Sequence, residues 1–349
     1  MSTLATLRIN GRRLMEQIEA LGHVGALEDG SVCRLALTDE DRRGRDLAVS
    51  WMRELDLDVR IDRVGNIVGM REGTEVLPPV MTGSHIDTVA TGGKFDGAYG
   101  VLAGLELMRT LNEAAARTRH PLAVAVFTNE EGVRFHPDML GSLVYAGGLG
   151  VEDAWAIRAT DGPSLGEALA RIGYAGPMAP GAIVPHAFVE LHIEQGPILD
   201  AEGGCLGAVG NLQGISWQEV TIRGAANHAG TTPMPMRRDA AHGAARTVCF
   251  VRDLAQEIGG AQVGTVGSLQ LAPNLINVIP REAVLTVDLR NPDDTVLKDA
   301  ERRLDTFLRG LADREGLEIQ TRRLARFEPV VFDQRIVSAI QEAADLLGQ

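Results

Sequence analysis

The chain has 349 residues, of which 45% are hydrophobic and 23% charged, as in a globular protein large enough for two domains. A net charge of −13 and only 4% aromatic residues argue against nucleic-acid and anionic-membrane partners. The three cysteines have no metal-type or disulfide-framework spacing. Residues 1–20 lack the apolar stretch of a secretory signal, and no apolar run is long enough to span a membrane. We therefore expect a cytoplasmic protein.

Strands and helices alternate in the first half of the chain. Apolar residues at helical or strand-like spacing predict helices over 8–22 and 39–55, strands over 59–61, 66–70 and 80–83, a helix over 98–111 and a strand over 122–127. Asp39 is a plausible N-cap of the second helix. This alternation is typical of an α/β fold with an open, mostly parallel sheet.

The pattern changes after a glycine-rich segment around 203–214, which we interpret as a linker. The expected order is then strand 217–222, helix 239–258, strands 263–271 and 283–290, helix 294–314 and strand 317–323. This order suits a small α+β domain with helices on one face of its sheet. We expect residues 211–326 to form an inserted domain, and 1–210 plus 327–349 to form the catalytic domain.

Residues that commonly bind metals stand just after the apolar runs. His85 and Asp87 follow the run at 80–83, Glu130 and Glu131 follow 122–127, and His192 follows another apolar run at 187–191. Because ligands bind at the carboxyl ends of strands in open α/β sheets, these side chains should meet at one edge.

Asp96 lies 11 residues after His85 at the start of a helix, from where it can reach back. Imidazoles with carboxylates suit zinc, manganese, cobalt or nickel, and a carboxylate between ligand groups can bridge two ions about 3.5–4 Å apart. The alternatives are a solvated acidic loop for the glutamates and ordinary turn or hydrogen-bonding roles for single histidines and aspartates.

Seven strings occur in order along the chain: GSHIDTV, GGKFDGAYGVLAGLE, FTNEEGVRF, HIEQGPIL, NHAGTTPM with RRDA, NLINVIP and DLRNP. Together they resemble the hydantoinase/carbamoylase family of metal-dependent amidohydrolases, from about residue 10 to 345. That family includes N-carbamoyl-L-amino acid hydrolases, allantoate amidohydrolases and some β-ureidopropionases, and it belongs with the di-metal aminoacylases and carboxypeptidases. The resemblance implies a catalytic domain of the di-zinc aminopeptidase/carboxypeptidase type with an inserted lid and dimerisation domain.

The resemblance also implies roles for individual residues. The metal ligands would be His85, Asp96, Glu131 and His192, with Asp96 bridging two divalent ions. Glu130 would be the catalytic base, and Asp87 would orient the ring of His85. The substrate-binding residues would be Gln195, His228, Asn277 and Arg290, of which His228 and Asn277 typically reach the site from the partner subunit of a homodimer.

Each second-domain residue also has a simpler interpretation. His228 lies in a loop rich in small residues and is otherwise a turn histidine. Asn277 precedes Pro280, and its alternative role is to cap a turn. Arg290 stands near Asp288, and its alternative role is to form a surface ion pair with it. We leave these alternatives open.

One feature departs from the family pattern. Members carry a further metal-binding histidine near the C-terminus, in a Ser-Gly-Ala-Gly-His-type segment, whereas this sequence has no histidine after His242. We therefore expect either a C-terminally truncated form, in which the second ion lacks a ligand, or a site in which water takes the missing ligand position.

Our hypothesis is a metal-dependent amidohydrolase that converts an N-carbamoyl-L-amino acid to the amino acid, ammonia and carbon dioxide. Allantoate and N-carbamoyl-β-alanine are the alternative substrates. A second class of hypothesis is an inactive, truncated homologue that binds a ligand without turnover.

Overall fold

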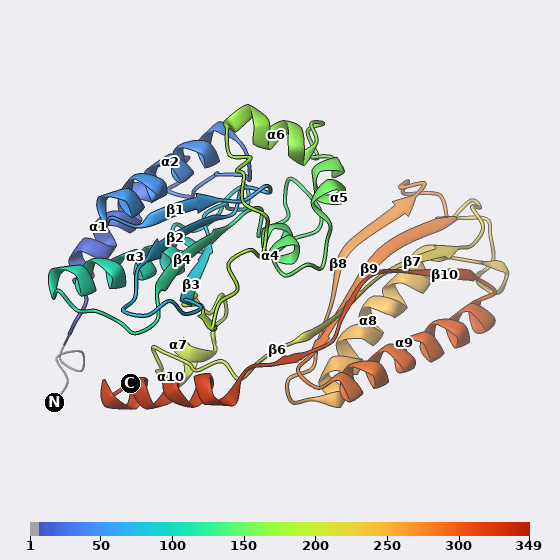
Figure 1. The fold of residues 1–349 in the computed structure, drawn as a ribbon. Helices are drawn as coiled ribbons and strands as arrows, with labels where there is room; N and C mark the ends of the chain where they lie inside the picture. The colour runs from blue at the N-terminus through green and yellow to red at the C-terminus, as the bar shows by residue number, and fades with distance from the viewer. Residues whose placement is uncertain (1–6) are drawn as a thin grey trace. The chain divides into compact units, whose positions relative to one another are not determined.

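The computed structural model describes residues 7–349, and the first six residues, which we assigned to the first domain, lie outside it. The described chain forms two compact units, one ending at Gln195 and the next beginning at Gly196 (Figure 1). The domain boundaries at 211 and 326 stay a prediction.

The first unit contains a five-stranded sheet in the order β1-β2-β4-β3-β5. Its strands are β1 (Asp58–Ile61), β2 (Ile67–Arg71), β3 (Val80–His85), β4 (Leu122–Phe127) and β5 (Ala187–Val189). β3 is parallel to both β4 and β5, whereas β1, β2 and β4 pair antiparallel. The expected α/β fold is confirmed, and its sheet is mixed. The parallel part is the part that carries the candidate ligands.

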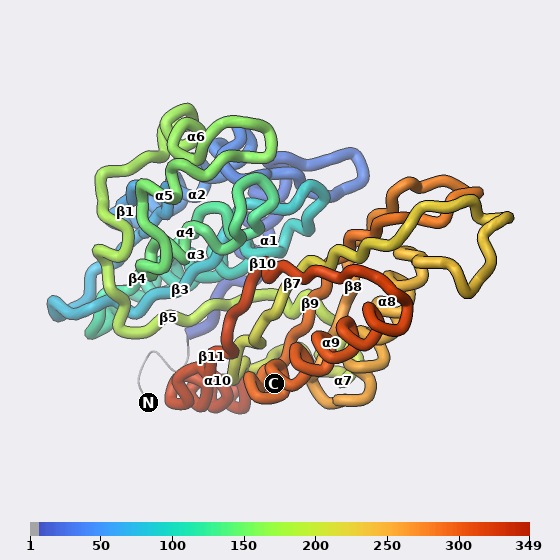
Figure 2. Tube along the Cα trace, turned by 90° about the vertical axis from the view of Figure 1, so that its right-hand side faces the viewer, coloured from blue at the N-terminus to red at the C-terminus, as the bar shows by residue number. Residues whose placement is uncertain are grey.

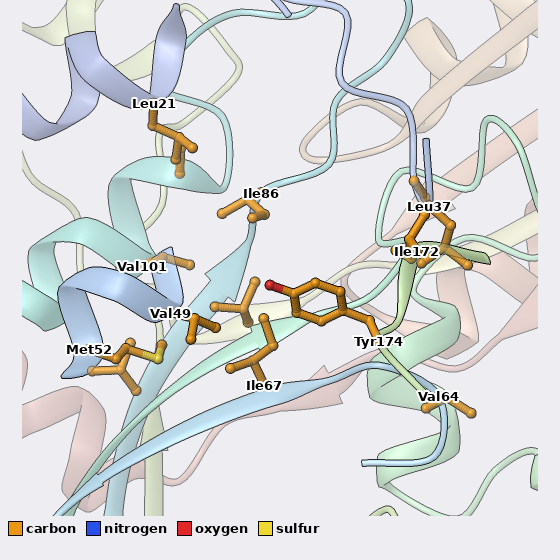
Figure 3. Packing of buried hydrophobic residues seen from close by; sticks show 14 of the residues in the cluster. Leu21, Leu37, Val49, Met52, Val64, Ile67, Ile86, Val101, Ile172 and Tyr174 are labelled. Atoms are coloured by element: carbon orange, nitrogen blue, oxygen red, sulfur yellow. The ribbon is translucent and has the colours of Figure 1, made fainter. Parts of the chain in front are cut away.

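Helices of the first unit bury their apolar side chains in one hydrophobic core. They are α1 (Gly11–Gly22), α2 (Asp39–Glu54), α3 (Ala98–Glu113), α4 (Leu140–Tyr145), α5 (Val151–Ala156) and α6 (Leu165–Ile172). Leu14, Ile18 and Leu21 recur every three or four residues on α1 and are all buried. Figure 3 shows how residues of α1, α2, α3, α6 and β2 pack in this core.

The N-cap of α2 differs from the sequence-based expectation. Thr38 is extended and its hydroxyl accepts the N–H of Asp41, so Thr38 is the cap and Asp39 the first helical residue. Asp39, Glu40 and Asp41 occupy the first turn, where the positive end of the helix dipole stabilises negative charge. The prediction of Asp39 as N-cap was therefore wrong by one residue.

The second unit contains an antiparallel four-stranded sheet in the order β10-β7-β9-β8. Its strands are β7 (Gly214–Arg223), β8 (Val263–Ala272), β9 (Glu282–Asn291) and β10 (Glu318–Phe327). Helices α8 (Ala240–Ile258) and α9 (Asp294–Glu315) cover one face (Figure 1). Side chains of β9 alternate strictly between buried and half-buried, which leaves Asp288 and Arg290 on the uncovered face.

Five further elements belong to this unit, and one of them, β6, lies in the segment expected as a linker. They are α7 (Ile198–Glu202), β6 (Asn211–Leu212), a 3₁₀ turn (Met234–Met236), β11 (Val330–Val331) and α10 (Gln334–Leu346). The chain leaves β10 through β11 and ends in α10 (Figure 2). Among residues 7–349, no helix is both long and apolar enough to cross a membrane.

Candidate metal centre

The parallel strands bring the candidate ligands of the first unit to one edge of the sheet. His85 is the last residue of β3 and lies opposite Phe127, the last residue of β4, in the parallel register. The chain after β4 carries Glu130 and Glu131, and His192 follows β5. The edge predicted from the sequence therefore holds these residues.

The ring of His85 is buried, and its hydrogen bonding defines which nitrogen faces the site. Nδ1 lies 2.9 Å from the main-chain oxygen of Asp87, which can only accept, so Nδ1 carries the proton. Nε2 lies 3.9 Å from Asp96 Oδ1 and 3.5 Å from Glu130 Oε2. In the neutral ring Nε2 carries the lone pair, so His85 can bind a cation that these carboxylates also hold.

His192 is arranged in the same way. Its Nδ1 lies 2.8 Å from the oxygen of Ile193, and its Nε2 lies 3.3 Å from Asp96 Oδ1. Asp96 thus stands between the two imidazoles, whose ring centroids are 6.0 Å apart. One ligand atom each of His85, Asp96 and His192 lie within 4.8 Å of one another. The other oxygen of Asp96 accepts the side-chain N–H of Gln195 at 2.7 Å.

Glu130 and Glu131 complete a concentration of negative charge beside these three residues. Burial raises the pKa of Glu131 to about 7, and repulsion from Asp96 and Glu130 adds to this effect. Burial also raises the pKa of Glu130 above its ordinary value, with a further contribution from Asp87. Glu130 lines a cavity of about 740 Å³, so a small molecule can approach it.

Asp87 holds His85 and the glutamates in a way that the sequence does not reveal. The His85 ring bonds to the main-chain oxygen of Asp87, while the nearest carboxylate oxygen is 3.9 Å from Nδ1. The carboxylate instead accepts the main-chain N–H groups of Glu130 and Glu131, each at 3.2 Å. Asp87 therefore joins the end of β3 to the turn that carries both glutamates.

Two carboxylate oxygens fit a bound cation. Asp96 Oδ1 and Glu131 Oε1 are buried and have no hydrogen-bond donor among the described residues. A buried acceptor without a partner is costly, and a cation between the imidazole lone pairs and these oxygens removes that cost. The donor set of two imidazoles and carboxylates suits a divalent transition metal.

Gly97 leaves the space that the His85 ring occupies. Its φ of +59° is left-handed, and a Cβ atom built there would lie 2.4 Å from Nε2 of His85. Only glycine satisfies both conditions, because any side chain would displace the nitrogen that faces Asp96. The contact with the His85 ring therefore explains why the residue after Asp96 in the GGKFDG string is glycine.

In the second unit, His228 and Asn277 come from two loops that pair through main-chain hydrogen bonds. Ala229 N donates to the oxygen of Asn277, and Ile279 N donates to the oxygen of Asn227. His228 Nδ1 accepts the N–H of Gly230 at 3.1 Å, so a neutral ring carries its proton on the exposed Nε2. His228 is therefore set to donate a hydrogen bond outward.

Arg237 supports this loop, and the sequence analysis did not find it. Its guanidinium donates to the main-chain oxygens of Thr232 and Ala229, at 3.1 and 2.6 Å. The RRDA string contains the adjacent arginines Arg237 and Arg238, and nothing in the sequence indicates which of them binds the loop.

Arg290 lies on the uncovered face of the second sheet and already has a carboxylate partner. Its Nε and Nη2 donate to Asp288 at 3.0 to 3.1 Å, and its guanidinium carbon is 5.8 Å from the Trp217 ring centroid. The ion-pair alternative is thus observed. Asp288 binds the edge of the guanidinium formed by Nε and Nη2. The N–H groups on the Nη1–Nη2 edge can therefore bind a second anion.

Comparison with known proteins identifies the family of this chain. A family model described as peptidase family M20/M25/M40 matches residues 81–349. The chain belongs to this family. A crystal structure of an amidase of the hydantoinase/carbamoylase family from Burkholderia multivorans has a TM-score of 0.93 and 44% identity, and the match covers 98% of this chain and 84% of that one.

Two related proteins indicate a more specific group within this family, the amidohydrolases. An N-carbamoyl-L-amino-acid amidohydrolase of Rhizobium meliloti is 41% identical over 98% of this chain and 82% of its own length. An allantoate amidohydrolase of Bacillus subtilis is 34% identical over 95% of this chain and 81% of its own length. The resemblance to hydantoinase/carbamoylase proteins is therefore confirmed, whereas the roles of single residues and the C-terminal truncation stay predictions.

Proposed function

We propose that this M20 protein is a metal-dependent amidohydrolase that hydrolyses the C–N bond of an N-carbamoyl-L-amino acid to the amino acid, ammonia and carbon dioxide. The observation that carries the proposal is the group of His85, Asp96 and His192 with Glu130 beside it, in a chain 41% identical to an enzyme named for this reaction. Neither the group nor the likeness would suffice alone, because the fold hosts several hydrolases.

Four side chains would hold the metal. They are His85, Asp96, Glu131 and His192, and the position of Asp96 between the imidazoles suits it to bridge two ions. Zinc, manganese, cobalt and nickel all accept this donor set. Bound divalent ions lower the pKa of water and polarise the carbonyl of a ureido group, which is a poor electrophile.

Glu130 would act as the general base. Its carboxylate is 3.5 Å from Nε2 of His85 and lines the open cavity, so it can take a proton from water and pass it to the leaving nitrogen. Asp87 would keep Glu130 and Glu131 in place through their main-chain N–H groups. Gln195 would hold Asp96 and contact the substrate.

Three residues of the second unit would bind the substrate. His228, with its proton on Nε2, and Asn277, on the paired loop, would donate hydrogen bonds to the developing oxyanion. The free end of the Arg290 guanidinium would bind the α-carboxylate.

We propose a homodimer in which the second unit contributes His228 and Asn277 to the site of its partner. Large apolar side chains flank both residues and are exposed in the single chain, namely Met234, Met236, Leu275 and Ile276. Clustered exposed apolar residues are typical of interaction surfaces. A division into a catalytic domain (1–210 plus 327–349) and an inserted domain (211–326), and a cytoplasmic location, complete the proposal.

The test is ammonia release by protein loaded with manganese or zinc. The panel holds several N-carbamoyl-L-amino acids, allantoate, N-carbamoyl-β-alanine and an N-acetyl amino acid. Release from the carbamoyl-L-amino acids alone supports the proposal. Release from allantoate, the substrate named for relatives at 34% identity, replaces the substrate but keeps the reaction class. No release from any compound, with metal bound, favours a non-catalytic binding protein.

A further inference from the structure

The turn Thr128–Glu131, which follows β4, carries both glutamates of the candidate centre and is anchored at every residue. Asp87 accepts the N–H groups of Glu130 and Glu131. From the other side, the N–H of Met139 donates to Glu130 O at 2.7 Å, and the N–H of Leu140 donates to Asn129 O at 3.2 Å. Such anchoring matters because carboxylates act only when held in a productive geometry.

Asn66, in the loop between β1 and β2, binds the first residue of this turn. Its Oδ1 accepts the N–H of Thr128 at 2.9 Å, and its Nδ2 donates to the oxygen of Gly141 at 2.9 Å. Gly141 in turn donates its N–H to Thr128 O at 2.8 Å, which closes a ring of hydrogen bonds. The amide orientation is unambiguous, because the N–H of Thr128 can only donate and the Gly141 oxygen can only accept.

The space around this ring is filled. Asn66 is completely buried, and a Cβ atom built on Gly141 would lie 2.4 Å from Asn66 Oδ1 and 2.5 Å from Thr128 N. No water or side chain fits between the segments at that contact. Asp62 holds Asn66 in place, because its carboxylate accepts both the main-chain N–H and the side-chain N–H of Asn66.

Arg45 of α2 binds the side chain of the same threonine. Its Nη2 donates to Thr128 Oγ1 at 3.2 Å, its Nη1 donates to Gly65 O at 2.7 Å, and its Nε donates to Asp41 at 2.8 Å. Arg45 and Asp41 are both fully buried, so their orientation is held by these partners. Arg45 therefore links α2, the β1–β2 loop and the turn.

We propose that Asn66 and Arg45 are positioning residues, which act through Thr128 to set where Glu130 and Glu131 point. The roles of the two glutamates rest on the proposed function, whereas the anchoring of the turn does not. Losing either anchor should loosen residues 128–131, weaken metal binding through Glu131 and lower kcat through Glu130. KM should change little, because neither anchor faces a substrate.

The decisive comparison is Thr128→Val against Thr128→Ser. Valine keeps the shape of threonine but removes the acceptor for Arg45, whereas serine keeps the hydroxyl and loses only a methyl group. In metal-free protein, Thr128→Val should speed amide exchange of residues 128–131 about tenfold, the equivalent of one lost hydrogen bond to a charged donor. Zinc affinity, measured by calorimetry with zinc alone, should fall about 10- to 100-fold. Thr128→Ser should change both much less.

Arg45→Lys is the second variant, since lysine keeps the charge but cannot reach all three acceptors. The matched control is Glu106→Gln on α3, a buried side chain whose partners are Asn10, Arg13 and Thr110 and none in the turn. The control should lower the melting temperature without changing local exchange at 128–131 or zinc affinity.

The outcomes separate this inference from the proposed function. Equal effects of valine and serine, or effects of valine and Arg45→Lys that match those of the control, would overturn the inference. Wild-type protein that binds zinc but releases no ammonia would overturn the proposed function alone. If the wild type binds no zinc, the exchange comparison in metal-free protein still decides whether Arg45 and Thr128 hold the turn.

Discussion

Gly97→Ala should weaken metal binding by roughly 100-fold while leaving most of the fold intact. The added Cβ would lie 2.4 Å from Nε2 of His85, whereas ordinary contacts begin at 3.4 Å, so the ring must move by at least about 1 Å. The φ of +59° adds roughly 1–2 kcal/mol of strain for alanine. Because the displaced nitrogen faces Asp96, the change strikes the proposed ligand group directly.

The magnitude follows from linkage between binding and unfolding. Displacing a ligand by about 1 Å should weaken metal binding by roughly 100-fold, the upper end of the loss that follows when the support of a metal ligand is removed. With zinc at 100 times the wild-type dissociation constant, binding stabilises the wild type by about 2.7 kcal/mol, and a 100-fold weaker variant by only ~0.4 kcal/mol. The assay is urea unfolding with and without zinc, supported by calorimetric titration of the metal-free protein.

Gly93→Ala is the matched control in the same glycine-rich turn. A Cβ atom there meets nothing within 4 Å, and its backbone is not left-handed. This variant should bind zinc like the wild type. Our reasoning would be refuted if Gly97→Ala kept wild-type zinc affinity, since the His85 ring would then not depend on the space that glycine leaves.

Three further predictions concern other parts of the protein. Glu130→Gln should lower kcat by about 10²- to 10⁴-fold with zinc affinity nearly unchanged, and substantial turnover by the zinc-loaded variant would exclude Glu130 as the base. Arg290→Lys should raise KM for carbamoyl amino acids about tenfold or more but leave KM for their carboxamides unchanged, and an equal rise for both would exclude a carboxylate partner. Burial raises the pKa of Asp62 to about 6, so the native state keeps a proton that the unfolded chain has lost, and stability should fall as the pH rises from about 4 to 6. Asp62→Asn should lack that fall, worth at most roughly 3 kcal/mol, in urea unfolding across this range, and parallel curves for both proteins would contradict the assignment.

The candidate ligands could be predicted from sequence because one topological rule locates them. His85, Glu131 and His192 each follow an apolar run, and parallel strands present their carboxyl ends at one edge. The sequence contains no equally general rule for the antiparallel pairing of β2 with β1 and β4, because short strands pair according to contacts far along the chain. The mixed sheet therefore became visible only in the structure.

Local errors have local physical reasons. Both Thr38 and Asp39 carry a side-chain oxygen that suits an N-cap, and the backbone conformation of Thr38, not the residue type, decides between them. Asp87 was expected to orient the His85 ring through its carboxylate, but its main-chain oxygen bonds to the ring and its carboxylate accepts the N–H groups of both glutamates. A sequence position implies proximity, whereas the atoms that make the bond depend on how both chain segments turn.

The anchors of the Thr128–Glu131 turn were missed for a deeper reason. A metal ligand is recognisable by type, because few residues donate to a divalent cation, whereas Asn66 and Arg45 are types that occur mostly on surfaces. Their importance comes from complete burial and from a partner 62 or 83 residues away. Buried polar side chains are kept only where each hydrogen bond is satisfied, so a polar group buried beneath a candidate site is itself a reason to look for a positioning role. By that criterion the structure adds to the ligand set a supporting layer that no motif in this sequence marks, and the comparison of Thr128→Val with Thr128→Ser measures how much of the site depends on it.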